Sequence, residues 1–236
     1  MVLARRQFLL APLTLGVATR IMAKSSPPVF DARDLEAQLG QGGRIGFFAL
    51  DNGSGRSIAH RSDERFAMAS TFKLLLAAKA LYEVQKKRLK LDQLISFTAA
   101  DKVAFSPLIG SALEKGQGAL PLVTLVGGMM EYSDNTAANL LLRQLGGPTG
   151  LNNFLRYAGD KVTRLDRIEP ELNSNSRGDE RDTSTPKAMV QLMPAQAARA
   201  SPRVVKKPSR YKPSRPPPSS EINTVEVSCK VLVVAL

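Results

Sequence analysis

The stretch Met68–Leu81, MASTFKLLLAAKAL, places a lysine, Lys73, at the start of an apolar run. The apolar run after Lys73 has neither Gly nor Pro, which predicts a buried helix from Ser70 to about Lys86. Lys73 falls in the first turn, where the positive end of the helix dipole and burial both disfavour its charge. The sequence therefore predicts that groups from elsewhere in the chain offset the cost of this lysine.

Ser70 and Lys73 form an S-x-x-K pair, and residues at this spacing lie on one helix face, about 5–6 Å apart at Cβ. A serine hydroxyl is a weak nucleophile until a neighbouring base takes its proton, and a lysine whose pKa is lowered by burial is such a base. An isolated pair has a second interpretation, in which Ser70 or Thr71 caps the helix and Lys73 extends toward solvent. A further motif is needed to decide between them.

Tyr132-Ser133-Asp134-Asn135 supplies that motif, because S-x-x-K followed by S-D-N occurs in class A β-lactamases and penicillin-binding proteins. The chain resembles a class A β-lactamase from about residue 35 to residue 193. The segments that carry the resemblance, in order, are RFAMASTFK, YSDNTAANLLL, GGP, RLDRIEPELN and GDERDTSTP.

The resemblance implies four catalytic residues. Ser70 would attack the lactam carbonyl, and Lys73 would share or relay its proton, although which group is the acylation base is disputed for the family. Ser133 would pass a proton toward the lactam nitrogen. Glu169 would activate the water that releases the acyl group. A carboxylate close to Lys73 would also stabilise its ammonium form.

The resemblance implies further roles in substrate binding and in positioning. Asn135 would bind the substrate's amide, Asn173 would help to hold the water, and Phe105 would be a wall of the site, with a core aromatic as the competing interpretation. The residues with positional roles are Asp134, which would brace its own loop; Pro170, in a cis peptide bond with Glu169; and the ion pair of Arg167 with Asp182.

The resemblance implies an α+β fold like that of β-lactamases and penicillin-binding transpeptidases, with an all-helical subdomain beside an antiparallel sheet flanked by helices. The patterning itself predicts a helix over 32–41, two strands within 44–61, a long polar loop over 163–186 and a helix from Pro186. The last three strands of the family's sheet and its C-terminal helix are expected to be missing.

Composition excludes several kinds of site. The 236 residues include one cysteine and one histidine, so an internal disulfide and a multi-histidine metal cluster are ruled out, and we expect no metal or cofactor. The formal net charge is +12, but the excess is concentrated at the two ends of the chain. We therefore expect a small-molecule β-lactam partner, no nucleic acid and a monomer.

Residues 1–23 have the pattern of an export signal, with a basic start, a short apolar stretch and small residues up to Ala23. Arg5-Arg6 followed by Gln-Phe-Leu is typical of a twin-arginine signal, and an ordinary secretory signal is the alternative. The apolar stretch is too short to span a bilayer. The sequence predicts a periplasmic or secreted protein with no membrane span after signal removal.

The expected domain occupies residues 24–195 and is incomplete, because no Lys-Thr-Gly or Lys-Ser-Gly triplet occurs in the sequence. Residues 196–236 form a basic, Pro- and Ser-rich tail in which Glu221 and Glu226 are the only acidic residues. Its composition predicts disorder. Its last segment, VEVSCKVLVVAL, has strand propensity but no evident partner.

Two other functions remain open at this stage. A penicillin-binding peptidase or sensor would be acylated without releasing the acyl group, and the loop with Glu169 argues against it. A non-enzymatic fragment whose basic tail binds anionic surfaces would make no use of Ser70.

The abrupt change of composition after about Pro194 predicts that the tail is translated out of frame. The coding DNA, read in its other two frames, is expected to encode a Lys-Ser/Thr-Gly segment followed by a helix. If neither frame encodes such a segment, the frameshift hypothesis is wrong.

Overall fold

The computed structural model describes residues 32–39, 43–51, 54–174, 176, 178–199 and 233–235. The expected export signal over residues 1–23 and most of the expected tail over 196–236 lie outside the described residues.

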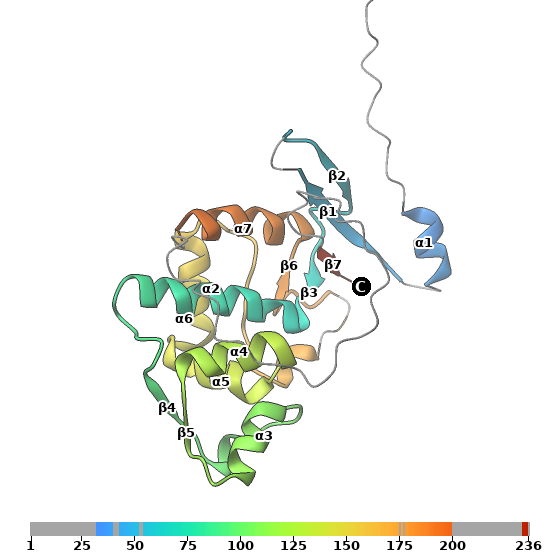
Figure 1. Cartoon of the computed structure of the whole chain (residues 1–236). Helices are drawn as coiled ribbons and strands as arrows, with labels where there is room; N and C mark the ends of the chain where they lie inside the picture. Colours follow the sequence, from blue (N-terminus) through green and yellow to red (C-terminus); the bar gives the residue numbers. More distant parts are fainter. Residues whose placement is uncertain are drawn as a thin grey trace, which may run out of the picture.

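The described elements form an α+β structure, in agreement with the expected fold class (Figure 1). In chain order they are α1 (Arg33–Gln38), β1 (Gly46–Leu50), β2 (Ser57–His60), β3 (Phe66–Ala67), η1 (Ala69–Thr71), α2 (Phe72–Gln85), β4 (Leu94–Ser96), η2 (Ala99–Asp101), α3 (Pro107–Glu114), β5 (Ala119–Pro121), α4 (Leu122–Tyr132), α5 (Asn135–Gln144), α6 (Gly147–Tyr157), η3 (Glu171–Asn173), β6 (Thr183–Ser184), α7 (Pro186–Arg199) and β7 (Val233–Ala235).

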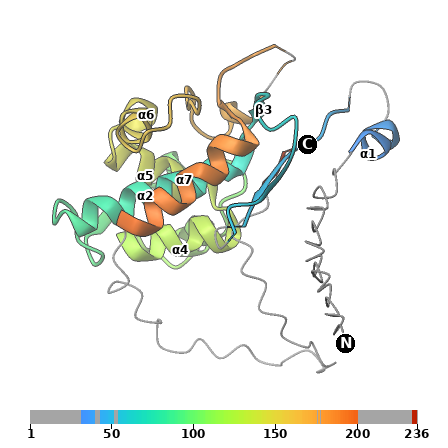
Figure 2. The same ribbon diagram turned by 90° about the horizontal axis from the view of Figure 1, so that it is seen from above.

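Helix α2 is the centre of the helical part, and it contacts α4, α5 and α6 (Figure 2). It is apolar on most of its circumference, which is typical of a helix enclosed by neighbours. Phe72 and Leu76 are fully buried, and Leu141 of α5 and Leu151 of α6 are equally buried in the same core. The predicted helix is confirmed, with η1 as a short 3₁₀ turn before it.

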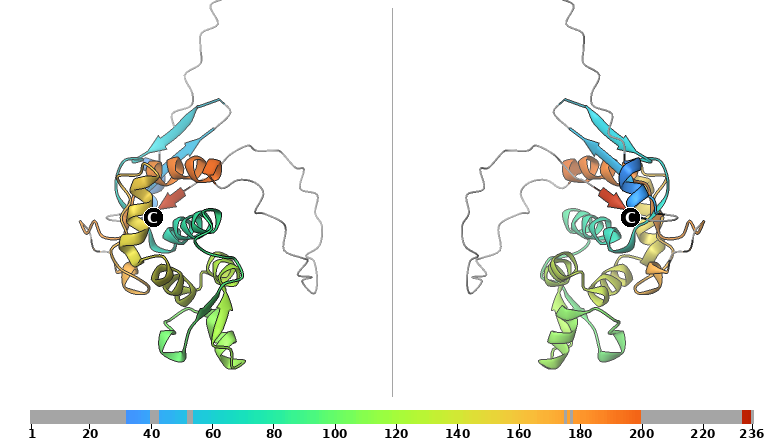
Figure 3. Two further views of the ribbon diagram at one scale, coloured as in Figure 1. Left: turned by 90° about the vertical axis from the view of Figure 1, so that its left-hand side faces the viewer. Right: turned by 90° about the vertical axis from the view of Figure 1, so that its right-hand side faces the viewer.

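The main sheet lies to one side of the helices and has the order β2-β1-β7 (Figure 3). Strands β1 and β2 pair antiparallel, with Phe47 opposite His60, as the sequence predicts. Helix α7 packs on β1 and β7 and closes the sheet toward the helices. No helix within the described ranges is long and apolar enough to cross a membrane.

One expectation about the C-terminal part is wrong. The final segment has a partner after all, because β7 pairs antiparallel with β1, with Gly46 opposite Ala235. The open edge of β1 offers backbone donors and acceptors, which a Val-rich strand can satisfy. Helix α7 runs from Pro186 to Arg199 and includes Pro194.

The long loop begins and ends beside the strand that leads to Ser70. Strand β3 pairs with β6 at the end of the loop, and the Met68 N–H donates to the Asp182 carbonyl at 2.9 Å. The Asp182 carboxylate is fully buried, accepts from the backbone N–H groups of Asp166 and Arg167, and pairs with the Arg167 guanidinium. This ion pair closes the neck of the loop.

We predict that Arg167→Gln lowers the free energy of unfolding by about 3 kcal/mol, because it leaves a buried carboxylate without its cation. Urea unfolding followed by circular dichroism measures the loss.

Arg164→Gln is the matched control in the same loop. The Arg164 guanidinium holds the pKa of Asp166 below its usual range, but this pair is exposed to solvent, so its loss costs about 1 kcal/mol or less. An equal loss of unfolding free energy in Arg167→Gln and Arg164→Gln would contradict the conclusion that the ion pair of Arg167 with Asp182 closes the loop.

Candidate active site

Three segments far apart in the sequence meet at the start of α2. The turn η1 and the first turn of α2 carry Ser70 and Lys73, the connection from α4 to α5 carries Ser133, and the long loop carries Glu169. Ala69 and Ser133 have positive φ angles of 40° and 55°. Positive φ is costly for residues with a side chain, and such strain concentrates at functional sites.

Lys73 is 2% exposed, and oxygen atoms of the site surround its ammonium. Its Nζ lies 3.1 Å from Ser70 Oγ, 2.9 Å from Ser133 Oγ, 2.8 Å from the Ser133 carbonyl and 2.6 Å from Asn135 Oδ1. Glu169 Oε1 is 3.1 Å from the same nitrogen. These contacts and the opposite charge compensate for the burial of the cation.

Glu169 is also buried, at 1% exposed, and its carboxylate points toward Lys73. Asn173 Nδ2 donates to Oε2 at 2.6 Å. Oε1 accepts no hydrogen bond among the described residues, although it faces the ammonium. The peptide bond between Glu169 and Pro170 is cis, as expected. The carboxylate therefore has one oxygen held by an amide and the other facing the cation.

The two serine hydroxyls are close enough to exchange a proton. Ser133 Oγ donates to Ser70 Oγ at 3.0 Å, and both contact Lys73. Ser70 lies just before α2, so the positive end of that helix dipole is adjacent to its oxygen. The arrangement places the hydroxyls of Ser70 and Ser133 and the ammonium of Lys73 in one continuous hydrogen-bond network.

The side chain of Asn135 is already engaged in this structure, because Oδ1 accepts from Lys73 and Nδ2 donates to the Ala104 carbonyl at 3.0 Å. Phe105 is 65% exposed and has a φ of 58°, so the interpretation as a core aromatic is wrong. The Asn135 N–H donates to the Phe105 carbonyl at 3.0 Å, which places Phe105 next to the Ser133 loop.

Asp134 caps α5 and ties it to α3. Its fully buried carboxylate accepts from the backbone N–H groups of Ala137 at 2.7 Å and Ile109 at 3.1 Å. An N-cap aspartate satisfies donors that the first helical turn leaves free. These bonds fix the loop that carries Ser133 and Asn135.

Asn139 is a positioning residue that the sequence did not single out. Its side-chain amide accepts from the Glu169 N–H at 3.0 Å and donates to the Glu169 carbonyl at 2.8 Å. The two bonds hold the main chain of the residue whose carboxylate reaches Lys73. Asn139 stands between Ala138 and Leu140, which are both buried. A polar residue between two apolar ones was the sequence signal that could have pointed to this positioning role.

No group of three or more His, Cys, Asp or Glu residues within the described part of the chain is arranged to hold a metal ion.

Residues 32–210 match the model of the β-lactamase enzyme family. The chain is 44% identical over 179 residues to β-lactamase AST-1 of Nocardia asteroides, covering 76% of this chain and 54% of the relative. It is 47% identical over 149 residues to β-lactamase SME-1 of Serratia marcescens, covering 63% and 50%.

Solved structures agree with these relatives. A β-lactamase from Desulfarculus baarsii superposes with a TM-score of 0.63 at 45% identity, covering 67% of this chain and 57% of that one. An ancestral class A β-lactamase superposes with a TM-score of 0.64 at 44% identity, covering 71% and 66%.

The chain spans about half the length of the curated relatives that it matches. The matched part includes every element that builds the network around Lys73. On the match to the family model and the similarity to class A structures, this chain belongs to the β-lactamase enzyme family.

Proposed function

We propose that this chain hydrolyses β-lactam rings through an acyl-enzyme on Ser70. The observation that carries the proposal is the network in which Lys73 Nζ contacts Ser70 Oγ, Ser133 Oγ and Glu169 Oε1 at 2.9–3.1 Å. An activated serine within reach of a proton acceptor and a second hydroxyl is the arrangement that nucleophilic acyl transfer requires.

In the acylation step, Ser70 Oγ attacks the lactam carbonyl and the bond from that carbon to the ring nitrogen breaks. Two routes lead from the Ser70 proton to a base: to Lys73 Nζ after the ammonium has passed one proton to Glu169, or through a water to Glu169 while Lys73 stays protonated. Ser133 Oγ, 3.0 Å from Ser70 Oγ, delivers a proton to the departing nitrogen. The opened ring stays attached to Ser70 as an ester.

In the deacylation step, Glu169 takes a proton from a water that attacks the ester carbonyl, and the bond from that carbon to Ser70 Oγ breaks. Ser70 Oγ regains the proton that Glu169 returns through Lys73. Asn173 donates to Glu169 Oε2 and is placed to orient this water. Asn139 keeps the Glu169 main chain fixed while the carboxylate changes its protonation state. Precise placement of a general base is worth orders of magnitude in rate.

Slow acylation is part of the proposal. The family's Lys-Ser/Thr-Gly strand is absent from this sequence, and with it an oxyanion donor and a cation for the substrate carboxylate. Loss of one oxyanion donor costs about 10²–10³ in rate. We therefore propose turnover slower by at least that factor than in relatives that have the triplet.

The substrates we propose are penicillins and cephalosporins, and hydrolysis of either would confer antibiotic resistance. Export through the signal over residues 1–23, by the twin-arginine route, would place the protein in the periplasm or outside the cell. We propose that it acts there as a monomer.

We predict that Glu169→Gln accumulates a covalent benzylpenicillin adduct, because the isosteric amide cannot take a proton from water. Intact-protein mass spectrometry over time would show the adduct persisting at least 10²-fold longer than in the unmodified chain.

Ser70→Ala is the control and is expected to give no adduct. Adduct formation in Ser70→Ala would contradict the assignment of the nucleophile. An adduct that persists equally in Glu169→Gln and the unmodified chain would favour a penicillin-binding peptidase or sensor.

A further inference from the structure

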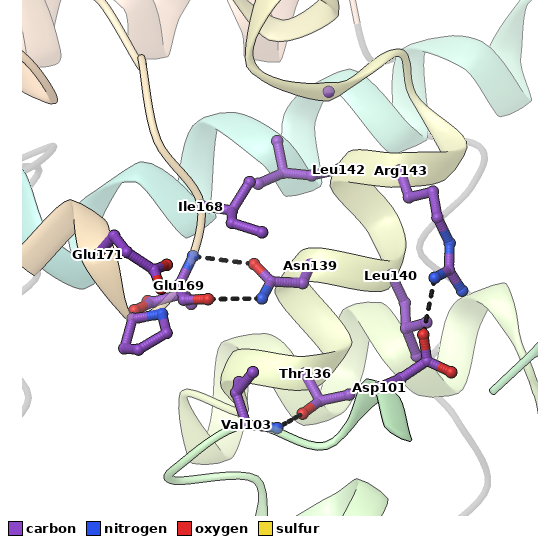
Figure 4. Close-up of a pocket in the computed structure, with 12 residues that line it drawn as sticks. Asp101, Val103, Thr136, Asn139, Leu140, Leu142, Arg143, Ile168, Glu169 and Glu171 are labelled. Carbon is purple, nitrogen blue, oxygen red and sulfur yellow. Dashed lines mark hydrogen bonds and ion pairs between the residues drawn. The ribbon is translucent and has the colours of Figure 1, made fainter. Parts of the chain in front are cut away.

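A pocket of about 330 Å³ lies beside the catalytic network, between α5 and the long loop (Figure 4). Its apolar lining includes Val103, Leu140, Ile168 and Pro170. Ile168 is 44% exposed, so part of its apolar side chain is accessible to a ligand. The volume is at the lower end of the range for small-molecule sites, so the pocket fits a ligand of one ring.

The pocket is separate from the catalytic network, because the main chain of Glu169 is the wall between them. Asn139 holds this wall from the pocket side through its two bonds to the Glu169 backbone (Figure 4). The Glu169 carboxylate leaves the wall in another direction, toward Lys73 and Asn173. Neither Ser70 nor Lys73 lines the pocket.

The charges of the lining favour a cation. Asp101 and Arg143 neutralise each other in an ion pair of 2.7 Å, and the Arg143 hydrogen bond holds the pKa of Asp101 below its usual range. Glu171 is exposed at the rim and has no ion-pair partner within the described part of the chain. One uncompensated carboxylate beside an apolar floor is complementary to a ligand with one apolar end and one positive end.

We propose that this pocket is a second binding site, for small hydrophobic amines: one ring or branched chain packed on Val103 and Ile168, with its ammonium near Glu171. The site is independent of β-lactam turnover.

Phenethylamine is a suitable probe, and ¹H–¹⁵N correlation spectra of the labelled full chain are the readout. We expect saturable shifts of the amides of Val103, Ile168 and Gly147 and of the Asn139 side chain, with Kd on the order of 1 mM for a ligand of this size. Phenethyl alcohol, which lacks the charge, is expected to bind about fivefold more weakly, and phenylacetate more weakly still.

Two variants test the two contacts that the proposal gives the ligand: the ammonium with Glu171, and the apolar group with the pocket lining. Glu171→Gln is expected to reduce phenethylamine binding about fivefold, to the level of phenethyl alcohol, whose own binding stays unchanged. Val103→Phe fills the pocket and is expected to abolish binding of both probes. Val123→Phe, at a site 49% exposed on α4 and outside the pocket, is the matched control and leaves binding unchanged.

Three results would overturn the proposal: shifts centred on Ser70 and Ser133, no saturable shifts, or equal binding of phenethylamine and phenylacetate. If Val103→Phe fails to fold, the residues whose amide signals shift and the binding to Glu171→Gln still decide whether the pocket binds amines.

Discussion

The ammonium of Lys73 is the constraint on which the rest of the site depends. A cation with 2% exposure at the start of an apolar helix is unstable unless oxygen atoms surround it. Ser70, Ser133, Asn135 and Glu169 supply those atoms from three separate segments. Each of these segments must therefore be held in place by further contacts outside the Lys73 network.

Each of these segments is held by a polar contact away from the reacting atoms. Asp134 fixes the loop of Ser133 by capping α5, and the ion pair of Arg167 with Asp182 closes the loop of Glu169. Asn139 joins the two by binding the Glu169 main chain from α5. Because the carboxylates of Asp134 and Asp182 are fully buried, the loss of their partners leaves them unsatisfied, which costs more than the bond itself contributes.

The sequence predicted most of this helical framework and much less of the sheet. Helix α2 and the strand pair β1–β2 follow from local patterns: an apolar run without Gly or Pro, and two short strands on either side of a turn. The pairing of β7 with β1 joins positions about 190 residues apart, and no local pattern specifies such a contact. The role of Asn139 was also missed, because it depends on a neighbour distant in sequence.

The sequence by itself determined the chemical groups: a serine and a lysine one turn apart, the Ser-Asp-Asn triplet, and a glutamate before a proline in a long polar loop. It also determined that no Lys-Ser/Thr-Gly triplet is present. Only the tertiary structure decided that the Lys73 ammonium contacts Ser70, Ser133, Asn135 and Glu169, and that a separate pocket lies behind the backbone of Glu169. The physical reason is that residue type is a local property, whereas the burial and the distances that give a charge its role are set by packing between distant segments.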